Sequence, residues 1–456
     1  MAGDRTDGRH ALIVGAGPAG LTAALELVGN GVPSTVFEGS SRAGGLARTE
    51  AKNGWLVDPG GHRFMTENTD VLDIWRTLVP PEEWLTVERS SAMYVDGHFV
   101  KYPLEAADLL RELGARRAVR GIGSYALGRL RTFIHPRGEE SFKAWGMRTF
   151  GEFWYCTFFD SYTRKTWRVD PTHITSDWAR QRIQPIQWAS PAAQRGQPFL
   201  FPAHGPGQVW QSLAARLATS GVDMHYNSPV AAIHRSAEGW ELELADGSRY
   251  RGDAVFSTMP LRTLTNCLHP TPPDAVVEAS RQLAYRDVVT VAVPVGPKSD
   301  FPYQWVYIPQ DDVQVGRIQN YAQWSPHMMP ENWKGTCLGL EYYVRESERD
   351  EFDDDHYLRT AQYDLDRLGI TTMDMASAFV VRSPFAYPIY DDRRADAVST
   401  ISAWLTEVHP NLYSIGRNGM HRYYNQDHAM MSAMVGVQSY LGKDVDPWTS
   451  NIVTRS

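Results

Sequence analysis

The clearest pattern of hydrophobic and polar positions lies near the N-terminus. Residues 11–14 form a short apolar run and 15–20 a glycine-rich turn. Residues 21–31 follow a helical period that ends at Gly31, and 33–38 form a second apolar run. This order of strand, tight turn, helix and strand predicts a βαβ unit.

The following two segments predict different structures. Residues 40–66 are rich in glycine, and we expect loop with short strands there. Residues 68–150 predict mostly helix, interrupted over 92–103 by a hairpin whose Asp-Gly pair favours a tight turn. A dense aromatic stretch then covers residues 153–167.

The second half of the chain alternates strands with few helices. Residues 205–235 predict a helix followed by a strand, and 240–260 a hairpin that returns to a strand. Residues 285–400 predict short strands around one helix near 357–370, and residues 411–442 predict a strand, a glycine turn and a long final helix. The whole pattern is typical of an α/β protein.

Composition narrows the class of protein. The 456 residues carry a net charge of -8, which disfavours nucleic acid as a partner. The basic run over 111–121 is expected to be a solvated helix face. No apolar run is long enough for a membrane span, although peripheral membrane contact stays open. The three cysteines show no metal-ligand spacing, so we expect a reducing cytoplasm and no metal site.

The turn after the first strand carries the candidate chemistry. Gly15, Gly17 and Gly20 follow a strand and open a helix, which is the context that a dinucleotide-binding turn requires. The glycines allow the tight turn and the close approach of the pyrophosphate, which lies at the helix N-terminus. Glu38 ends the second strand, where a carboxylate binds the adenosine ribose.

Two further segments favour FAD over NAD. Residues 38–49, "EGSSRAGGLART", resemble the extended nucleotide motif of glutathione-reductase-like flavoproteins, with Gly45 for close approach and Arg42 and Arg48 for phosphate or flavin. Residues 415–434 contain the final helix, whose positive end could face the flavin and stabilise negative charge on its reduced form.

Three motifs resemble those of the UDP-galactopyranose mutases. Residues 416–427, "GRNGMHRYYNQD", are similar to their "GRxGxYRYxDxD" signature, 161–167, "SYTRKTW", to "GYTxKxW", and 60–66, "GGHRFMT", to "GPHxFHT". The chain departs from these patterns at Gly61, Met65, His421 and Asn425. Together with the nucleotide turn, the resemblance covers nearly the whole chain and extends to the wider amine-oxidase-like and protoporphyrinogen-oxidase-like flavoenzymes.

The resemblance implies an FAD site and a substrate pocket. The expected cofactor-binding residues are Gly15, Gly17, Pro18, Ala19, Gly20, Glu38, Gly39, Arg42, Gly45, Leu46, Gly60, Gly61, His62, Val230, Gly416, Arg417 and Asp427. The expected substrate-binding residues are Tyr162, Lys165, Trp167, Arg317, Tyr387, Arg422 and Tyr423, with His62, Trp167 and Tyr423 as catalytic residues. For Lys165 and Arg422 an internal ion pair is an equal alternative.

The resemblance also implies a fold and its division into domains. We expect a Rossmann-like, glutathione-reductase-like FAD-binding domain with an interleaved α+β substrate domain. The FAD-binding domain would comprise residues 8–66, 205–285 and 400–445, and the substrate domain 67–204 and 286–399.

Three functions stay open at this point. The first is pyranose/furanose isomerisation of a sugar nucleotide through reduced flavin, or flavin-dependent sugar oxidation. The second is hydride abstraction from an amine or cyclic substrate, with Trp167, Tyr423 and Tyr424 as walls and His62 or His421 handling a proton. The third is a non-catalytic FAD-binding module. NAD(P)H or another reductant is an expected partner of the flavin, and a homodimer stays open.

Overall fold

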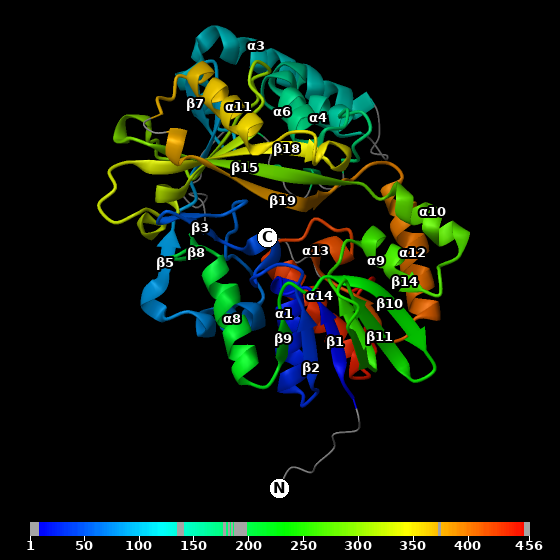
Figure 1. The fold of residues 1–456 in the computed structure, drawn as a ribbon. Helices are drawn as coiled ribbons and strands as arrows, with labels where there is room; N and C mark the ends of the chain where they lie inside the picture. Colours follow the sequence, from blue (N-terminus) through cyan, green and yellow to red (C-terminus); the bar gives the residue numbers. More distant parts are fainter. Residues whose placement is uncertain are drawn as a thin grey trace.

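Five parallel strands form the sheet at the base of the molecule in Figure 1. The computed structural model describes residues 9–134, 141–176, 198–372 and 375–450, together with Ala179, Arg180, Ile183 and Ile186. The strand order is β20-β13-β1-β2-β9, with bounds Leu412–Ser414, Ala254–Ser257, Ala11–Val14, Ser34–Phe37 and Asp223–His225. Helix α1 (Pro18–Gly29) joins β1 to β2, which confirms the predicted βαβ unit.

The parallel sheet is covered on both faces, so its central strands β1, β2 and β13 are buried at every position. Helices α1, α8 (Gly207–Thr219) and α14 (Gln426–Tyr440) bury one face. The other face packs against a four-stranded sheet and α12 (Arg394–Val408). That second sheet has the order β12-β11-β10-β14, with bounds Arg249–Gly252, Gly239–Leu244, Val230–Ser236 and Leu268–His269. This arrangement confirms the expected α/β fold with a Rossmann-like nucleotide domain.

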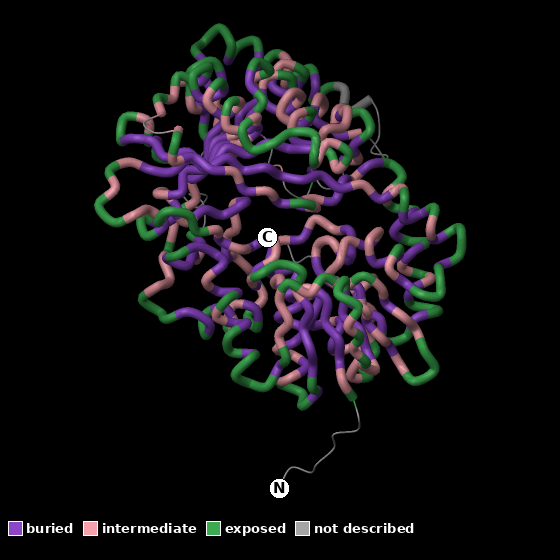
Figure 2. The backbone as a smooth tube through the Cα atoms, viewed as in Figure 1, coloured by how far each residue is buried: buried purple, intermediate pink, exposed green. Residues whose placement is uncertain are grey.

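A seven-stranded sheet crosses the middle of Figure 1. Its order is β19-β15-β18-β17-β16-β6-β7, with bounds Phe379–Pro388, Tyr285–Val295, Thr336–Arg345, Arg317–Asn320, Trp305–Tyr307, Ser91–Val95 and His98–Lys101. Strand β15 is buried at every position, because both faces of the sheet are covered; Figure 2 shows this band in purple. The hairpin of β6 and β7 confirms the turn predicted over 92–103.

Helices cover the upper side of this sheet in Figure 1. They are α3 (Ala106–Ile134), α4 (Phe142–Phe150), α5 (Glu152–Tyr155) and α6 (Ser161–Trp167), with a π-helical turn over Cys156–Asp160. Helix α11 (Asp354–Arg367) lies where one helix was predicted near 357–370. No helix of the described residues has the length and apolarity that a bilayer crossing requires.

Three elements differ from the prediction for residues 285–400. The strands are longer than expected: β15 has 11 residues and β18 has 10. Helix α12 was not predicted, and the expected domain boundary at 399/400 falls inside it. Since α12 packs in the same core as strands β1 and β13, its first turns lie with the nucleotide domain.

Candidate active site

The glycine turn after β1 has the geometry of a phosphate-binding loop. Gly15 has a φ of +100°, and a Cβ on Gly20 would lie 1.9 Å from the carbonyl oxygen of Gly15. Gly17 caps α1 without a side-chain hydrogen bond, and the first turn contains no acidic residue. The first N–H groups of α1 are therefore open to a phosphate, which the positive end of the helix attracts.

Glu38 lies beside this turn, at the end of β2. One carboxylate oxygen accepts a hydrogen bond from the backbone N–H of Ala16 at 2.8 Å, and the other accepts from the N–H and hydroxyl of Ser40. These bonds fix the carboxylate where a ribose would bind. The arrangement agrees with the role expected for Glu38.

A first cavity of about 170 Å³, which we call the cofactor cavity, runs from the glycine turn toward the seven-stranded sheet. Gly416 has a φ of +78°, and a Cβ there would lie 2.9 Å from the Cβ of Ala19, so α13 (Gly416–Gly419) approaches α1 closely. The lining residues are Gly15, Gly17, Pro18, Ala19, Glu38, Gly45, Leu46, Ala47, His62, Thr258, Gly416, Arg417, Asn418, Tyr424, Asn425, Gln426 and Ala429.

FAD fits the chemistry of this lining. The open N-terminus of α1 suits the pyrophosphate and Glu38 suits the adenosine ribose, at one end of the cavity. Arg417 and His62 line the other end, where an isoalloxazine would meet a substrate. Arg417 is held in place there, because its Nε donates to the carbonyl of Tyr424 and its Nη1 to the carbonyl of Ala386.

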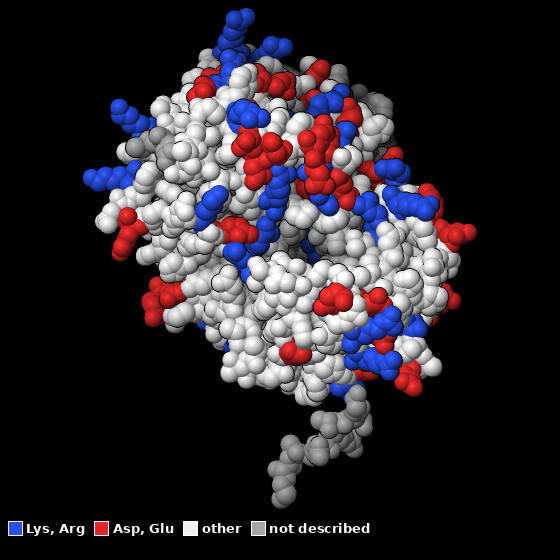
Figure 3. Space-filling model, viewed as in Figure 1, with Lys and Arg blue, Asp and Glu red and all other residues white. Residues whose placement is uncertain are grey.

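A second cavity of about 240 Å³, the substrate cavity, adjoins the first. Both cavities are lined by His62, Arg417, Asn425 and Gln426, so they meet at these four residues. Figure 3 shows the surface hollowed between the two halves of the molecule. The other lining residues are Gly61, Arg63, Met65, Arg89, Met93, Tyr102, Phe142, Phe159, Tyr162, Thr163, Ile183, Trp305, Tyr307, Arg317, Tyr387 and Tyr423.

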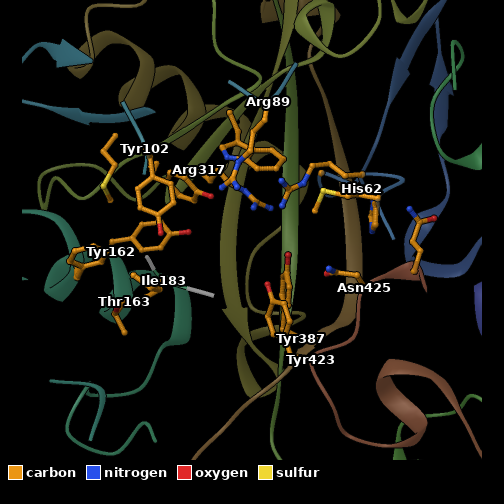
Figure 4. Close-up of a pocket in the computed structure, with 18 of the residues that line it drawn as sticks. His62, Arg89, Tyr102, Tyr162, Thr163, Ile183, Arg317, Tyr387, Tyr423 and Asn425 are labelled. Carbon is orange, nitrogen blue, oxygen red and sulfur yellow. The ribbon is translucent and has the colours of Figure 1, made fainter. Parts of the chain in front are cut away.

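Arginines and tyrosines dominate the polar surface of the substrate cavity. Its described lining contains four arginines and five tyrosines, and no aspartate, glutamate or lysine. Figure 4 shows Arg89 and Arg317 pointing into the cavity from one side, Tyr102 and Tyr162 from another, and Tyr387 and Tyr423 opposite the arginines. A cavity with this lining suits an anionic ligand. The ligand would also stack on the phenol rings or form hydrogen bonds with their hydroxyls.

Arg317 is anchored by a buried carboxylate. Its Nε and Nη2 each donate to Glu341 at 2.9 Å, and Glu341 is fully buried. Gln319 and the hydroxyl of Tyr343 also donate to this carboxylate. The carboxylate of Glu341 thus accepts all of these hydrogen bonds behind the cavity wall. It holds the guanidinium of Arg317 rigidly at that wall.

His62 is electrically neutral at neutral pH. Burial, together with the nearby Arg417 and Arg317 cations, lowers the pKa of His62 to about 3, although a hydrogen bond with the Gly60 backbone opposes the shift. The imidazole can therefore donate or accept a hydrogen bond at the junction of the cavities, but it does not act as a cationic acid.

Burial keeps two tyrosines of the substrate cavity protonated. Burial raises the pKa of Tyr162 well above its ordinary value and also raises that of Tyr387. The rings of Tyr387 and Tyr423 stack with centroids 5.2 Å apart, and the guanidinium of Arg417 lies over both rings. These phenols can donate hydrogen bonds to anionic oxygens.

Three residues predicted to bind substrate lie outside the substrate cavity. The Lys165 ammonium donates to the carbonyls of Gln310, Val313 and Val315, and thus ties α6 to a loop. Trp167 is buried in the aromatic core beneath α3 to α6. Arg422 donates to the hydroxyl of Tyr424 and the carbonyl of Trp448. The structure brings together the other four: Tyr162, Arg317, Tyr387 and Tyr423.

The residues predicted to bind the cofactor also fall into those that line a cavity and those that do not. Most line the cofactor cavity, and Gly61 lines the substrate cavity. Arg42 instead pairs with Glu50 at 3.1 Å and is partly exposed, and Asp427 is buried in the first turn of α14. Gly20, Gly39, Gly60 and Val230 do not line either cavity in the described structure.

Sequence reasoning missed several lining residues. Arg63 directly follows His62 and could have been found from that motif. Arg89, Tyr102 and Tyr307 come from separate strands and connections, and no local pattern marks them. Trp305 is buried and also lines the substrate cavity.

Solved structures with the same fold include two flavoenzyme types. A reduced UDP-galactopyranose mutase matches with a TM-score of 0.85 and 22% identity, covering 97% of this chain and 98% of the mutase. A protein from Exiguobacterium sp. 255-15, described as a protoporphyrinogen oxidase, matches with a TM-score of 0.73 and 15% identity, covering 95% and 99%. At these identities the likeness concerns the fold.

Curated relatives match shorter parts of their own chains. The Arabidopsis thaliana lysine-specific histone demethylase 1 homolog 3 is 25% identical over 335 residues, which are 61% of this chain and 20% of that protein. The L-amino acid oxidase Cdc18 of Crotalus durissus cumanensis is 44% identical over 68 residues, 15% of this chain and 14% of the oxidase. The chain thus spans at most about a fifth of the length of these relatives.

A family match begins at the first residue of α1 and covers most of the substrate cavity's wall. It is to the flavin-containing amine oxidoreductases and extends over residues 18–299, more than half of the chain. Flavin is the cofactor that this family implies, in agreement with the fit of FAD to the cofactor cavity. The chain belongs to the flavin-containing amine oxidoreductase family.

Proposed function

We propose that this protein uses reduced FAD to interconvert the pyranose and furanose forms of a sugar carried on a nucleoside diphosphate. The observation that carries the proposal is the described lining of the substrate cavity, which contains four arginines and no carboxylate. A diphosphate brings two negative charges, which such a lining would bind and orient. The tyrosines offer stacking surfaces and hydroxyl donors for the sugar and its phosphates.

Each part of the cavity has a role in this proposal. Arg317 and Arg89 bind the diphosphate, and the stacked Tyr387 and Tyr423 hold its sugar end against the cofactor. His62, neutral at the junction, holds a sugar hydroxyl or flavin heteroatom by a hydrogen bond. Reduced FAD supplies an electron-rich nitrogen when it is bound, and no net oxidation occurs.

The family relationship supports a second candidate, the oxidation of an amino acid. The curated relatives include L-amino acid oxidases. An arginine of the substrate cavity could bind the carboxylate of such a substrate, and the deprotonated amine would face the flavin. The charge of the cavity ranks this candidate second, because one carboxylate satisfies fewer of the four arginines.

Anaerobic reduction of the purified flavoprotein, followed by mixing with a panel of nucleoside diphosphate sugars, tests the proposal. We expect a product with altered ring size while the flavin stays reduced. Steady oxygen consumption with an L-amino acid, without added reductant, would establish the oxidase instead. No response of the flavin spectrum to any sugar nucleotide, amine or reductant would favour a non-catalytic FAD module.

A further inference from the structure

Helix α3 carries most of the large exposed apolar side chains of the described chain. Of the eight large apolar side chains that are exposed there, five belong to α3: Leu110, Val119, Ile122, Leu127 and Leu130. Val119 and Leu127 are 69% and 61% exposed. Single exposed apolar residues are ordinary, but a group of this size on one helix marks a surface of interaction.

The exposed apolar residues lie on one side of the helix after its kink. The kink is at Gly114, which has a φ of 78°. At 3.6 residues per turn, Val119, Ile122, Leu127 and Leu130 fall within a sector of about 140°. We call this sector the outer face of α3; it is at the top of Figure 1.

The opposite side of α3 is fixed to the protein, so the helix cannot rotate to bury the outer face. A Cβ on Gly121 would lie 2.0 Å from the ring of Trp154, and one on Gly128 would lie 2.9 Å from the carbonyl oxygen of Met147. The hydroxyl of Ser124 accepts a hydrogen bond from the N–H of Phe153. Two glycines thus let α3 lie directly on α4 and α5.

Arginines lie within and beside the outer face in a protein that is acidic overall. Residues 115–130 contain Arg116, Arg117, Arg120 and Arg129 and no acidic residue, whereas the whole chain has a net charge of -8. By helical geometry Arg120 and Arg129 lie on opposite borders of the apolar sector. Only Arg117 of these four forms an ion pair with a described residue, with Asp96 at 2.8 Å.

We propose that the outer face of α3 binds the surface of an anionic lipid bilayer. A basic amphipathic helix lies in the interface with its apolar side chains among the acyl chains and its arginines at the phosphates. Charge favours this partner over a second copy of the chain, because a two-fold contact through the outer face would bring the arginines of both copies together.

Vesicle sedimentation with the full flavoprotein tests the proposal. One set of vesicles is phosphatidylcholine alone, and in the other about a third of the lipid is phosphatidylglycerol. We expect at least tenfold tighter binding to the anionic vesicles, lost as added salt screens the charges. Each arginine contributes about fivefold to this affinity, so Arg116→Ala should weaken it by about that factor.

Two variants distinguish vesicle binding through the outer face from the general effect of a new surface charge. Leu127→Glu places a charge within the apolar sector and should abolish vesicle binding while flavin content and melting temperature stay unchanged. Val408→Glu is the matched control, because Val408 is similarly exposed on helix α12, and it should bind as the wild type does. Equal binding to neutral and anionic vesicles, or unaltered binding by Leu127→Glu, would overturn the proposal. So would a dimer in solution that Leu127→Glu dissociates while neither protein binds vesicles.

Discussion

Removal of Arg317 has two effects, which a second substitution can separate. In Arg317→Met the carboxylate of Glu341 stays buried and loses two hydrogen bonds to a cation. Breaking a buried pair in this way costs about 3–5 kcal/mol. For a chain of this length the unfolding entropy converts that cost into a fall in melting temperature of about 3–5 °C. The same substitution removes a cation from the substrate cavity.

The double variant Arg317→Met with Glu341→Gln restores a neutral pair. Gln319 keeps an acceptor in the amide oxygen, and the amide NH2 can donate to the hydroxyl of Tyr343, so we expect most of the lost stability to return. Binding of a nucleoside diphosphate should stay weak, because the amide does not replace the guanidinium at the cavity wall.

Thermal melting and calorimetric titration with uridine diphosphate, on the wild type and both variants, give the two readouts. Recovery of diphosphate affinity in the double variant would refute a direct role of Arg317 in binding. A single variant that melts like the wild type would refute the argument that Glu341 needs its cation.

Three further outcomes are expected. Gly20→Ala should give a colourless protein that is destabilised by about 1–3 kcal/mol, because the new Cβ would clash with the Gly15 carbonyl. Absorbance measures the bound flavin, and full flavin content would contradict this prediction. Burial raises the pKa of Asp58 to about 8, so the folded state holds a proton that the unfolded state loses near pH 4, and stability should fall as pH rises from about 4 to 8. Asp58→Asn should flatten that dependence in melting experiments, and an unchanged slope would argue against a protonated Asp58. Arg417→Ala should release flavin because it removes two interactions with backbone carbonyls. Tyr423→Phe should retain flavin and weaken substrate binding. Equal flavin content with full activity in both variants would contradict the roles assigned to these two residues.

The nucleotide half of the site could be predicted because its determinants are local. Gly15, Gly17 and Gly20 lie within one turn, and their effects on the backbone depend on residues a few positions away. Strand β1 is apolar on both faces and β2 is buried throughout, which makes the βαβ unit visible in the sequence. The same holds for the hairpin of β6 and β7, whose turn is Asp-Gly.

The substrate half could not be predicted to the same extent because its walls come from distant segments. Arg89 precedes β6, and Tyr307 ends β16, a neighbour of β6 only after the seven-stranded sheet has formed. Lys165 shows the converse case: a motif singled it out as a substrate-binding residue, but three backbone carbonyls from another segment accept the hydrogen bonds of its ammonium. Tertiary packing decides whether a cation faces a ligand or the backbone. The spacing of residues in a sequence motif does not encode that packing.

The charge of the substrate cavity, rather than the fold, distinguishes the two candidate chemistries. Mutases and oxidases share this architecture, so the likeness to either leaves the substrate open. At a separation of about 5 Å and an effective dielectric constant of about 20, each charge pair is worth about 3 kcal/mol. A protonated amine would be repelled by that amount by each nearby arginine of the lining, whereas each phosphate would be attracted. The described lining, with four arginines of which Arg317 is paired with Glu341, therefore favours a diphosphate over an ammonium, and on this basis we rank sugar-nucleotide chemistry first.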